Sequence, residues 1–111
     1  MNKMKNILFV CTYNLQRSPT AEDIINNSPY HNTKYNAKSA GISSIAKVKI
    51  TKQSIEWSDM IFVMEHIHKE FLLKNFPGAK KKIIVLDIPD MYLRNDPYLI
   101  NLLKEKLKRY L

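Results

Sequence analysis

Short apolar runs alternate along the chain with stretches in which apolar residues recur every three or four positions. The first pattern is typical of buried strands and the second of amphipathic helices. Together they predict strands over residues 6–10, 35–40, 60–64 and 83–88, and helices over residues 19–27, 51–57, 65–75 and from 96 onward. This alternation predicts an α/β fold, a single three-layer domain over residues 1–111 with a four-stranded parallel sheet flanked by helices.

The segments between these elements contain residues typical of helix ends and turns. Ser18 is expected to cap the first helix with Pro19 in its first turn, and Asp96 with Pro97 to begin the last one. The lysine run at 80–82 is expected to be a solvated edge. One buried face of the last helix is expected to consist of Leu99, Leu103, Leu107 and Tyr110.

Length and composition fit a small protein that folds around one core. The chain has 111 residues, of which 45% are hydrophobic. Its longest purely apolar stretches, residues 7–10 and 83–86, are far shorter than the roughly 20 residues that cross a bilayer, so we expect no membrane span. The charged start, residues 1–5, precedes a run too short for a signal sequence, and we expect a cytoplasmic protein.

Charge and cysteine content narrow the chemistry. Lys and Arg outnumber Asp and Glu 18 to 10, and the net charge of +8 favours anionic partners such as phosphate esters, phosphorylated protein or, less readily, nucleic acid. The single cysteine excludes an internal disulfide and the Cys/His clusters of structural zinc. Cys11 is therefore either a buried apolar side chain or a reactive thiolate.

Residues 11–18 have the pattern C-x5-R-S between a predicted strand and a predicted helix. The pattern places a thiol and a guanidinium at the two ends of a tight loop whose N–H groups can point at an anion. The helix dipole adds positive potential there and favours the thiolate form of Cys11. Since the guanidinium fork matches the oxygens of a phosphate group, we expect the anion to be a phosphate. The residues expected to surround it are Thr12, Tyr13, Asn14, Leu15, Gln16, Arg17 and Ser18.

Arg17 and Cys11 could each have a purely structural role, as a surface cation and as a buried thiol, but the pattern favours a functional one. An arginine at a helix N-terminus opposes the helix dipole unless an anion is present, so Arg17 favours anion binding over a plain surface cation. Because Cys11 occurs in one motif with Arg17 and Ser18, it is better explained as a nucleophile than as a core thiol. Ser18 can donate a hydrogen bond to its thiolate, and Asn14 suits an unusual backbone turn.

The loop from Val10 to Pro19 resembles the V-C-x-x-N-x-x-R-S-P loop of the low-molecular-weight protein tyrosine phosphatases. Residues 39–41 are similar to the S-A-G of that family, residues 57–65 to its A-D-x-I-x-V-M-D segment, and residues 88–90 to the V-P-D stretch with its general acid. The best match is a short branch of predicted phosphatases that shares the run L-D-I-P-D at residues 86–90.

The resemblance implies a metal-independent phosphomonoesterase without a cofactor. Cys11 would form a phosphocysteine, Arg17 would bind the phosphoryl oxygens and Asp90 would protonate the leaving group. The expected substrate is phosphotyrosine in a protein, or a small phosphate ester. Asp87 is the less favoured acid, since period-two alternation places it on the opposite face from Asp90, and it could instead cap the turn or bind the loop.

This sequence also departs from the family pattern. Tyr13 replaces the usual glycine, which would narrow the loop mouth or add an aromatic wall, and Gln16 stands where a second cysteine is common. The segment between Gly41 and Trp57 is short, so the wall that recognises substrate would differ. Tyr92 would either stack against an aromatic leaving group or pack on the surface.

Two histidines lie close together in the sequence. His66 and His68 are spaced by two in a predicted helix, so they should lie on different faces, and we assign them no catalytic role and no shared metal.

An arsenate reductase with this single cysteine would need an external thiol. A non-catalytic binder of phosphorylated protein or RNA would use the loop and the charge without turnover, and would need neither nucleophile nor acid.

Overall fold

Strands and helices alternate in the computed structural model, which describes residues 4–111 apart from the side chain of Lys81. The strands are β1 (Lys5–Cys11), β2 (Tyr35–Gly41), β3 (Met60–Val63) and β4 (Ile83–Val85). The helices are α1 (Arg17–Asn26), α2 (Lys52–Trp57), α3 (His66–Asn75) and α4 (Pro97–Leu107), with a 3-10 helix η1 (Pro77–Lys82) before β4. The start of the charged N-terminal segment, residues 1–3, and part of the lysine run, the Lys81 side chain, lie outside the described residues.

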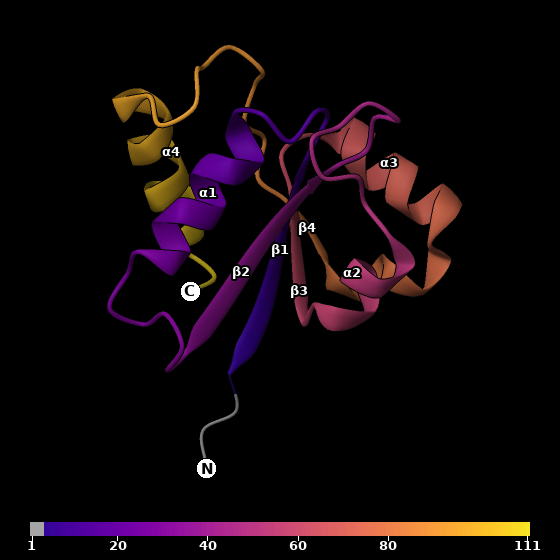
Figure 1. Cartoon of the computed structure of the whole chain (residues 1–111), viewed down its shortest axis with the longest axis horizontal. Helices are drawn as coiled ribbons and strands as arrows, with labels where there is room; N and C mark the ends of the chain where they lie inside the picture. Colours follow the sequence, from indigo (N-terminus) through magenta and orange to yellow (C-terminus); the bar gives the residue numbers. More distant parts are fainter. Residues whose placement is uncertain (1–3) are drawn as a thin grey trace.

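The four strands form one parallel sheet in the order β2-β1-β3-β4. Helices α1 and α4 cover one face, and α2 and α3 cover the other (Figure 1). This confirms the predicted α/β class and its flanked parallel sheet. The chain places β2 on one side of β1 and β3 on the other, and such a reversal opens a crevice at the carboxyl ends of the strands. Cys11 is the last residue of β1 and therefore lies at this crevice.

Apolar layers on both faces of the sheet hold β1 in place. Successive side chains of a strand point to opposite faces, so Ile7 and Phe9 pack under α1 and α4, while Leu8 and Val10 pack under α2 and α3. The Phe9 ring stacks on Phe62 of β3 with centroids 5.6 Å apart. A strand covered on both faces is a rigid base for the residues that follow it.

The last helix begins as its sequence predicts, but the prediction that Tyr110 belongs to its buried face was wrong. Asp96 accepts a hydrogen bond from the Tyr98 N–H at 2.8 Å, with Pro97 at the first helical position. Tyr110 lies beyond the end of α4, and its half-exposed ring packs edge-on against Phe62. The three predicted leucines of the buried face, Leu99, Leu103 and Leu107, are all buried.

The prediction that Ser18 caps α1 was wrong. Helix α1 begins at Arg17 with Gln16 in the capping position, and Gln16 makes no side-chain capping bond. The Ser18 hydroxyl instead contacts Cys11 and Asn14. Pro19 is tolerated deeper in the first turn than predicted, because N–H groups there have no acceptor within the helix.

Strand β4 is shorter than the predicted run over residues 83–88. The Leu86 N–H still donates to the Val63 carbonyl at 2.9 Å, but Asp87 then adopts φ 57° and turns the chain. Aspartate is one of the few non-glycine residues that enter this left-handed region readily. The turn sends Ile88, Pro89 and Asp90 over the carboxyl ends of the strands.

The remaining elements begin or end within one or two residues of the predicted bounds. The lysine run, expected as a solvated edge, lies in η1, where Lys80 is exposed and the Lys82 ammonium donates to the Ile55 carbonyl at 3.2 Å. None of the helices formed by residues 4–111 combines the length and apolar character needed to span a membrane.

Candidate active site

Cys11 ends β1 with its side chain almost fully buried and its sulfur 2.9 Å from the Ser18 hydroxyl oxygen. That oxygen accepts a hydrogen bond from the Asn14 amide at 2.9 Å. The Ser18 O–H is then free to donate to the Cys11 sulfur. A hydrogen bond from a hydroxyl favours the thiolate form, so the local contacts suit a nucleophile.

Asn14 fixes the direction of a longer chain of hydrogen bonds. Its backbone has φ 56°, and its two amide protons go to the hydroxyl oxygens of Ser18 and Ser39, both at 2.9 Å. The Ser39 hydroxyl in turn donates to the Glu22 carboxylate on α1. Because a carboxylate accepts and does not donate, the chain runs one way and leaves the Ser18 proton for Cys11.

Three carbonyls of the loop point outward, to the segment that follows β2. The carbonyl oxygens of Cys11, Thr12 and Tyr13 accept hydrogen bonds at 2.9 to 3.0 Å from N–H groups of residues 42–47. In a planar trans peptide the next N–H points away from the carbonyl, so the N–H groups of residues 12–14 point away from residues 42–47. Within residues 4–111, the N–H groups of residues 12–18 donate to no protein acceptor. The loop can therefore surround an anion with backbone donors.

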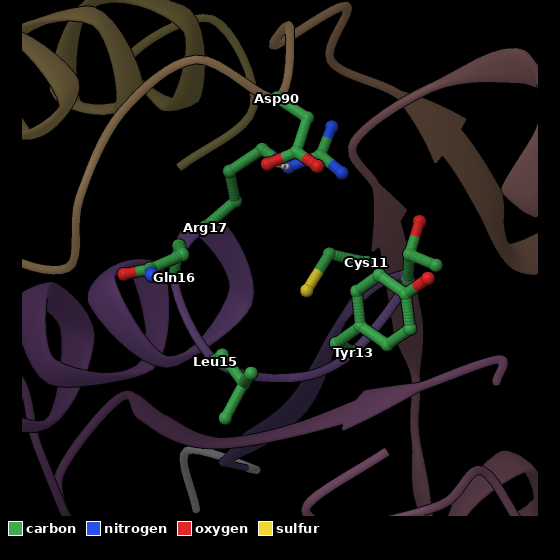
Figure 2. Close-up of a pocket in the computed structure, with 7 residues that line it drawn as sticks. Cys11, Tyr13, Leu15, Gln16, Arg17 and Asp90 are labelled. Carbon is green, nitrogen blue, oxygen red and sulfur yellow. Dashed lines mark ion pairs between the residues drawn. The ribbon is translucent and has the colours of Figure 1, made fainter. Parts of the chain in front are cut away.

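Arg17 closes the other end of the loop with a buried side chain, 2% exposed. Its guanidinium donates to the Ile88 carbonyl at 2.7 Å and to the Glu65 carboxylate. Its Nε lies 3.8 Å from an oxygen of Asp90. Figure 2 shows the Arg17 and Asp90 groups facing each other on the far side of the pocket from Leu15. These contacts fix the guanidinium before any anion binds.

The cavity between these groups encloses about 190 Å³. This is below the roughly 300 Å³ at which pockets begin to hold drug-sized ligands, and it suits a phosphate group with the first atoms of its ester. Its walls are Cys11, Thr12, Tyr13, Leu15, Gln16, Arg17 and Asp90 (Figure 2).

The two candidate acids lie in different surroundings. Asp90 lines the cavity, whereas Asp87 lies outside it, 67% exposed, with an oxygen 3.6 Å from the His66 imidazole. Tyr92 is partly buried and packs against the core beneath α1 and α4, and it is not part of the cavity wall.

The predicted loop residues divide into two groups. Tyr13 and Leu15 are half exposed at the mouth, 45% and 53%, and Thr12 and Gln16 also line the cavity. Asn14 and Ser18 are buried and do not line it, so their side chains act on the loop and on Cys11.

Sequence reasoning missed the buried imidazole beneath the loop. His68 is fully buried, with its Nε2 2.9 Å from the Thr12 hydroxyl oxygen and its Nδ1 accepting from the Glu65 N–H at 3.0 Å. Since Nδ1 accepts, Nε2 carries the proton and donates to Thr12. Burial and the neighbouring Arg17 cation, partly opposed by Glu65 and Asp90, together lower the pKa of His68 to about 4. The ring is neutral near pH 7.

Glu65 was missed as well, although a signal for it was present. It directly follows the predicted strand over residues 60–64, at the same edge of the sheet as Cys11 and Asp90, where ligands of parallel sheets bind. For His68 the spacing rule correctly separates it from exposed His66, but periodicity does not show which face lies under the loop. Among residues 4–111 no group of three or more His, Cys, Asp or Glu side chains could hold a metal ion.

Sequence comparison gives matches over the loop and beyond it. A family model described as "Low molecular weight phosphotyrosine protein phosphatase" matches residues 6–58. A protein-arginine-phosphatase from Geobacillus stearothermophilus is 30% identical over 102 residues, covering 72% of this chain and 68% of the relative.

Solved structures are similar over nearly the whole chain. The YwlE arginine phosphatase from Geobacillus stearothermophilus has a TM-score of 0.69 at 26% identity, covering 95% of this chain and 94% of the other. The tyrosine phosphatase Wzb from Escherichia coli, solved with phosphate, has a TM-score of 0.77 at 25% identity, covering 97% and 96%. A low molecular weight protein tyrosine phosphatase from Streptococcus pyogenes shares the fold, with a TM-score of 0.78 at 20% identity over 97% and 94%.

Proposed function

Since this chain belongs to the low-molecular-weight phosphotyrosine protein phosphatases, a family of cysteine-dependent phosphatases, we propose that Cys11 attacks the phosphorus of a phosphomonoester. The observation that supports this proposal is the arrangement of one cavity. It joins the Cys11 sulfur, which receives a hydrogen bond from Ser18, to the loop N–H groups, Arg17 and Asp90.

The reaction would proceed in two displacements. In the first, the bond from the Cys11 sulfur to phosphorus forms, the bond from phosphorus to the ester oxygen breaks, and Asp90 gives that oxygen its proton. In the second, Asp90 takes a proton from water, the water oxygen attacks phosphorus, and the thiolate leaves. Arg17 and the loop N–H groups stabilise the equatorial oxygens in both steps.

For the substrate we propose an aryl phosphate, with phosphotyrosine in a protein as the first candidate and a small phosphate ester as the second. Tyr13 and Leu15 give the mouth an apolar wall that suits an aromatic ring. Phosphoarginine is a further candidate, because the curated relative and solved neighbours such as the YwlE structure are arginine phosphatases. The Asp90 carboxylate at the cavity wall could accept from its guanidinium.

Replacing the nucleophile tests the proposal directly. Cys11→Ser should lose hydrolysis of para-nitrophenyl phosphate by about a thousandfold or more, while keeping phosphate binding, since the loop amides and Arg17 remain. Hydrolysis would be followed by absorbance and binding by calorimetry. His66→Gln is the matched control, because His66 is exposed and outside the cavity. Turnover of Cys11→Ser within tenfold of wild type would exclude Cys11 as the nucleophile.

The same assays separate the rival functions. A non-catalytic binder would bind phosphate but would not hydrolyse para-nitrophenyl phosphate, a phosphotyrosine peptide or phosphoarginine. An arsenate reductase would consume arsenate only when an external thiol is supplied, because the chain has one cysteine. Rates on phosphotyrosine peptide and phosphoarginine, compared at equal concentration, decide between the two protein substrates.

A further inference from the structure

The segment that follows Asp90 is tied to the first turns of α1. The Arg94 N–H donates to the side-chain oxygen of Gln16, and the Arg94 guanidinium donates to the Asp23 carboxylate at 2.9 Å. The Asn95 N–H donates to the Thr20 hydroxyl oxygen at 3.0 Å. These contacts connect the segment to the same turn of chain that supplies Arg17.

Gln16 and Thr20 are themselves held in place. The Gln16 carbonyl accepts from both the Thr20 hydroxyl, at 2.7 Å, and the Thr20 N–H, at 3.2 Å. Figure 2 shows the Gln16 side chain directed away from Cys11 and toward the segment after Asp90. The side chain of a cavity residue is therefore used to hold a neighbouring segment.

Asp90 has few contacts of its own. Its side chain is 55% exposed, and its distance of 3.8 Å to the Arg17 Nε exceeds a normal hydrogen bond. Both ends of its segment are nevertheless anchored. The Ile88 carbonyl is bound by Arg17 on one side, and Arg94 and Asn95 are bound to α1 on the other.

We propose that Gln16, Arg94 and Asp23 are positioning residues that hold the Asp90 carboxyl over the cavity for proton transfer. This inference rests on the proposed function, in which Asp90 is the general acid. A general acid works only within hydrogen-bond reach of the leaving oxygen. Releasing one end of the segment lowers the fraction of molecules in which Asp90 is within reach.

The Gln16 contact is a property of this chain's own loop sequence. A cysteine, which is common at this position in the family, has a shorter side chain and only a weak sulfur acceptor. The amide of Gln16 extends far enough for its oxygen to accept from the Arg94 backbone.

The test compares leaving groups in variants that remove one anchor each. Gln16→Met keeps the side-chain length without the acceptor, and Arg94→Gln removes the cation but keeps the backbone N–H. Both should slow phenyl phosphate by about tenfold and para-nitrophenyl phosphate by less than about twofold, because only the first leaving group needs a proton. The inhibition constant of phosphate should not change in Arg94→Gln.

Charge reversal and a distant ion pair supply the controls. Arg94→Asp should show the same leaving-group effect, and the double variant with Asp23→Arg should recover wild-type rates. Glu56→Gln breaks another exposed pair, Lys52 with Glu56 on α2, and should leave both rates unchanged. The Arg94 and Asp23 variants should fold, because an exposed ion pair contributes little to stability. Gln16→Met should fold because the hydrogen bond that it removes is exposed.

Three results would count against the inference, and they can be told apart. If Asp90→Asn shows the leaving-group effect and the anchor variants slow both substrates equally or neither, the positioning role is wrong and the phosphatase proposal stands. If Asp90→Asn itself shows no leaving-group effect, the acid assignment in the proposed function is wrong, and the positioning role falls with it. If the double variant Arg94→Asp with Asp23→Arg does not recover the wild-type rate on phenyl phosphate, the ion pair does not position Asp90.

Discussion

Asp87 and Asp90 are close in sequence, and their surroundings differ enough to separate their roles by experiment. Asp90 lines the cavity beside Arg17, and Asp87 faces His66 outside it. Asp90→Asn should slow cleavage of a phosphotyrosine peptide by about a hundredfold or more and para-nitrophenyl phosphate much less. Asp87→Asn should affect both substrates by a similar, small factor. Steady-state rates on both substrates would be measured, and leaving-group sensitivity only in Asp87→Asn would reverse the assignment.

His68 makes the stability of the protein depend on pH. Its pKa is about 4 in the folded chain, against an ordinary value of 6.5. Between these values the unfolded chain binds a proton that the folded chain does not, so the free energy of unfolding should fall as pH drops from 6.5 toward 4. The loss should reach up to about 3 kcal/mol and should be absent above this window.

Urea unfolding of wild type and His68→Gln over this pH window would measure the effect. The difference between the two proteins should change with pH, since the variant lacks the titrating ring. His66→Gln, on the same helix but 71% exposed, is the comparison that removes an imidazole from the surface. Parallel curves for wild type and His68→Gln would mean that the buried ring does not titrate as inferred.

Strand β2 meets the phosphate loop at Gly41, where a side chain has no room. A Cβ at this position would lie 2.6 Å from the Thr12 carbonyl oxygen and 2.9 Å from the Asn14 nitrogen. Both are backbone atoms of the loop and can move only if the loop moves. Gly41→Ala should therefore cost about 1 to 3 kcal/mol of stability and lower kcat by about tenfold or more.

Gly78 in η1 provides a matched control, because a Cβ there meets nothing within 4 Å. Gly78→Ala should retain wild-type phosphate affinity by calorimetry and wild-type turnover. If Gly41→Ala also retains both, the loop tolerates displacement and the close approach has no functional consequence.

The elements that periodicity predicts well are those whose pattern is decided locally. Helix α4 has its cap, its proline and its buried leucines within one segment, and β1 is a continuous apolar run covered on both faces. The start of α1 and the end of β4 were missed for a different reason. Ser18 contacts Cys11 rather than capping the helix, so a tertiary contact overrides its local preference. Asp87 takes a left-handed turn, which the period-two alternation of a strand does not reveal.

In the candidate site, too, some residues could be predicted from the sequence and others could not. Cys11 and Arg17 come together because one tight loop joins them, which the spacing already indicates. Asp90 could be placed at the cavity through the rule that strand ends share an edge of the sheet. Glu65 and His68 reach the loop from beyond β3, and no local pattern shows that their side chains turn toward Arg17 and Thr12.

The charge of the whole chain should influence how substrates are captured. With a net charge of +8, the protein attracts anionic substrates. At physiological ionic strength, salt screens this attraction beyond about 8 Å. The value of kcat/KM for an acidic phosphopeptide should fall by about threefold to tenfold between low and high salt, and kcat should change little. A basic phosphopeptide of equal length is the control. Equal salt dependence for both peptides would contradict long-range attraction.

The hydrogen bonds from residues 42–47 to the loop carbonyls also bear on the order of folding. These residues follow β2, so the N–H groups of the loop are aligned only after β1 and β2 have paired. An anion that needs those aligned groups binds the native state and not earlier ones. Phosphate should therefore slow unfolding in stopped-flow measurements. An unchanged refolding rate would place the alignment of these groups after the rate-limiting barrier, and a faster one would place it before.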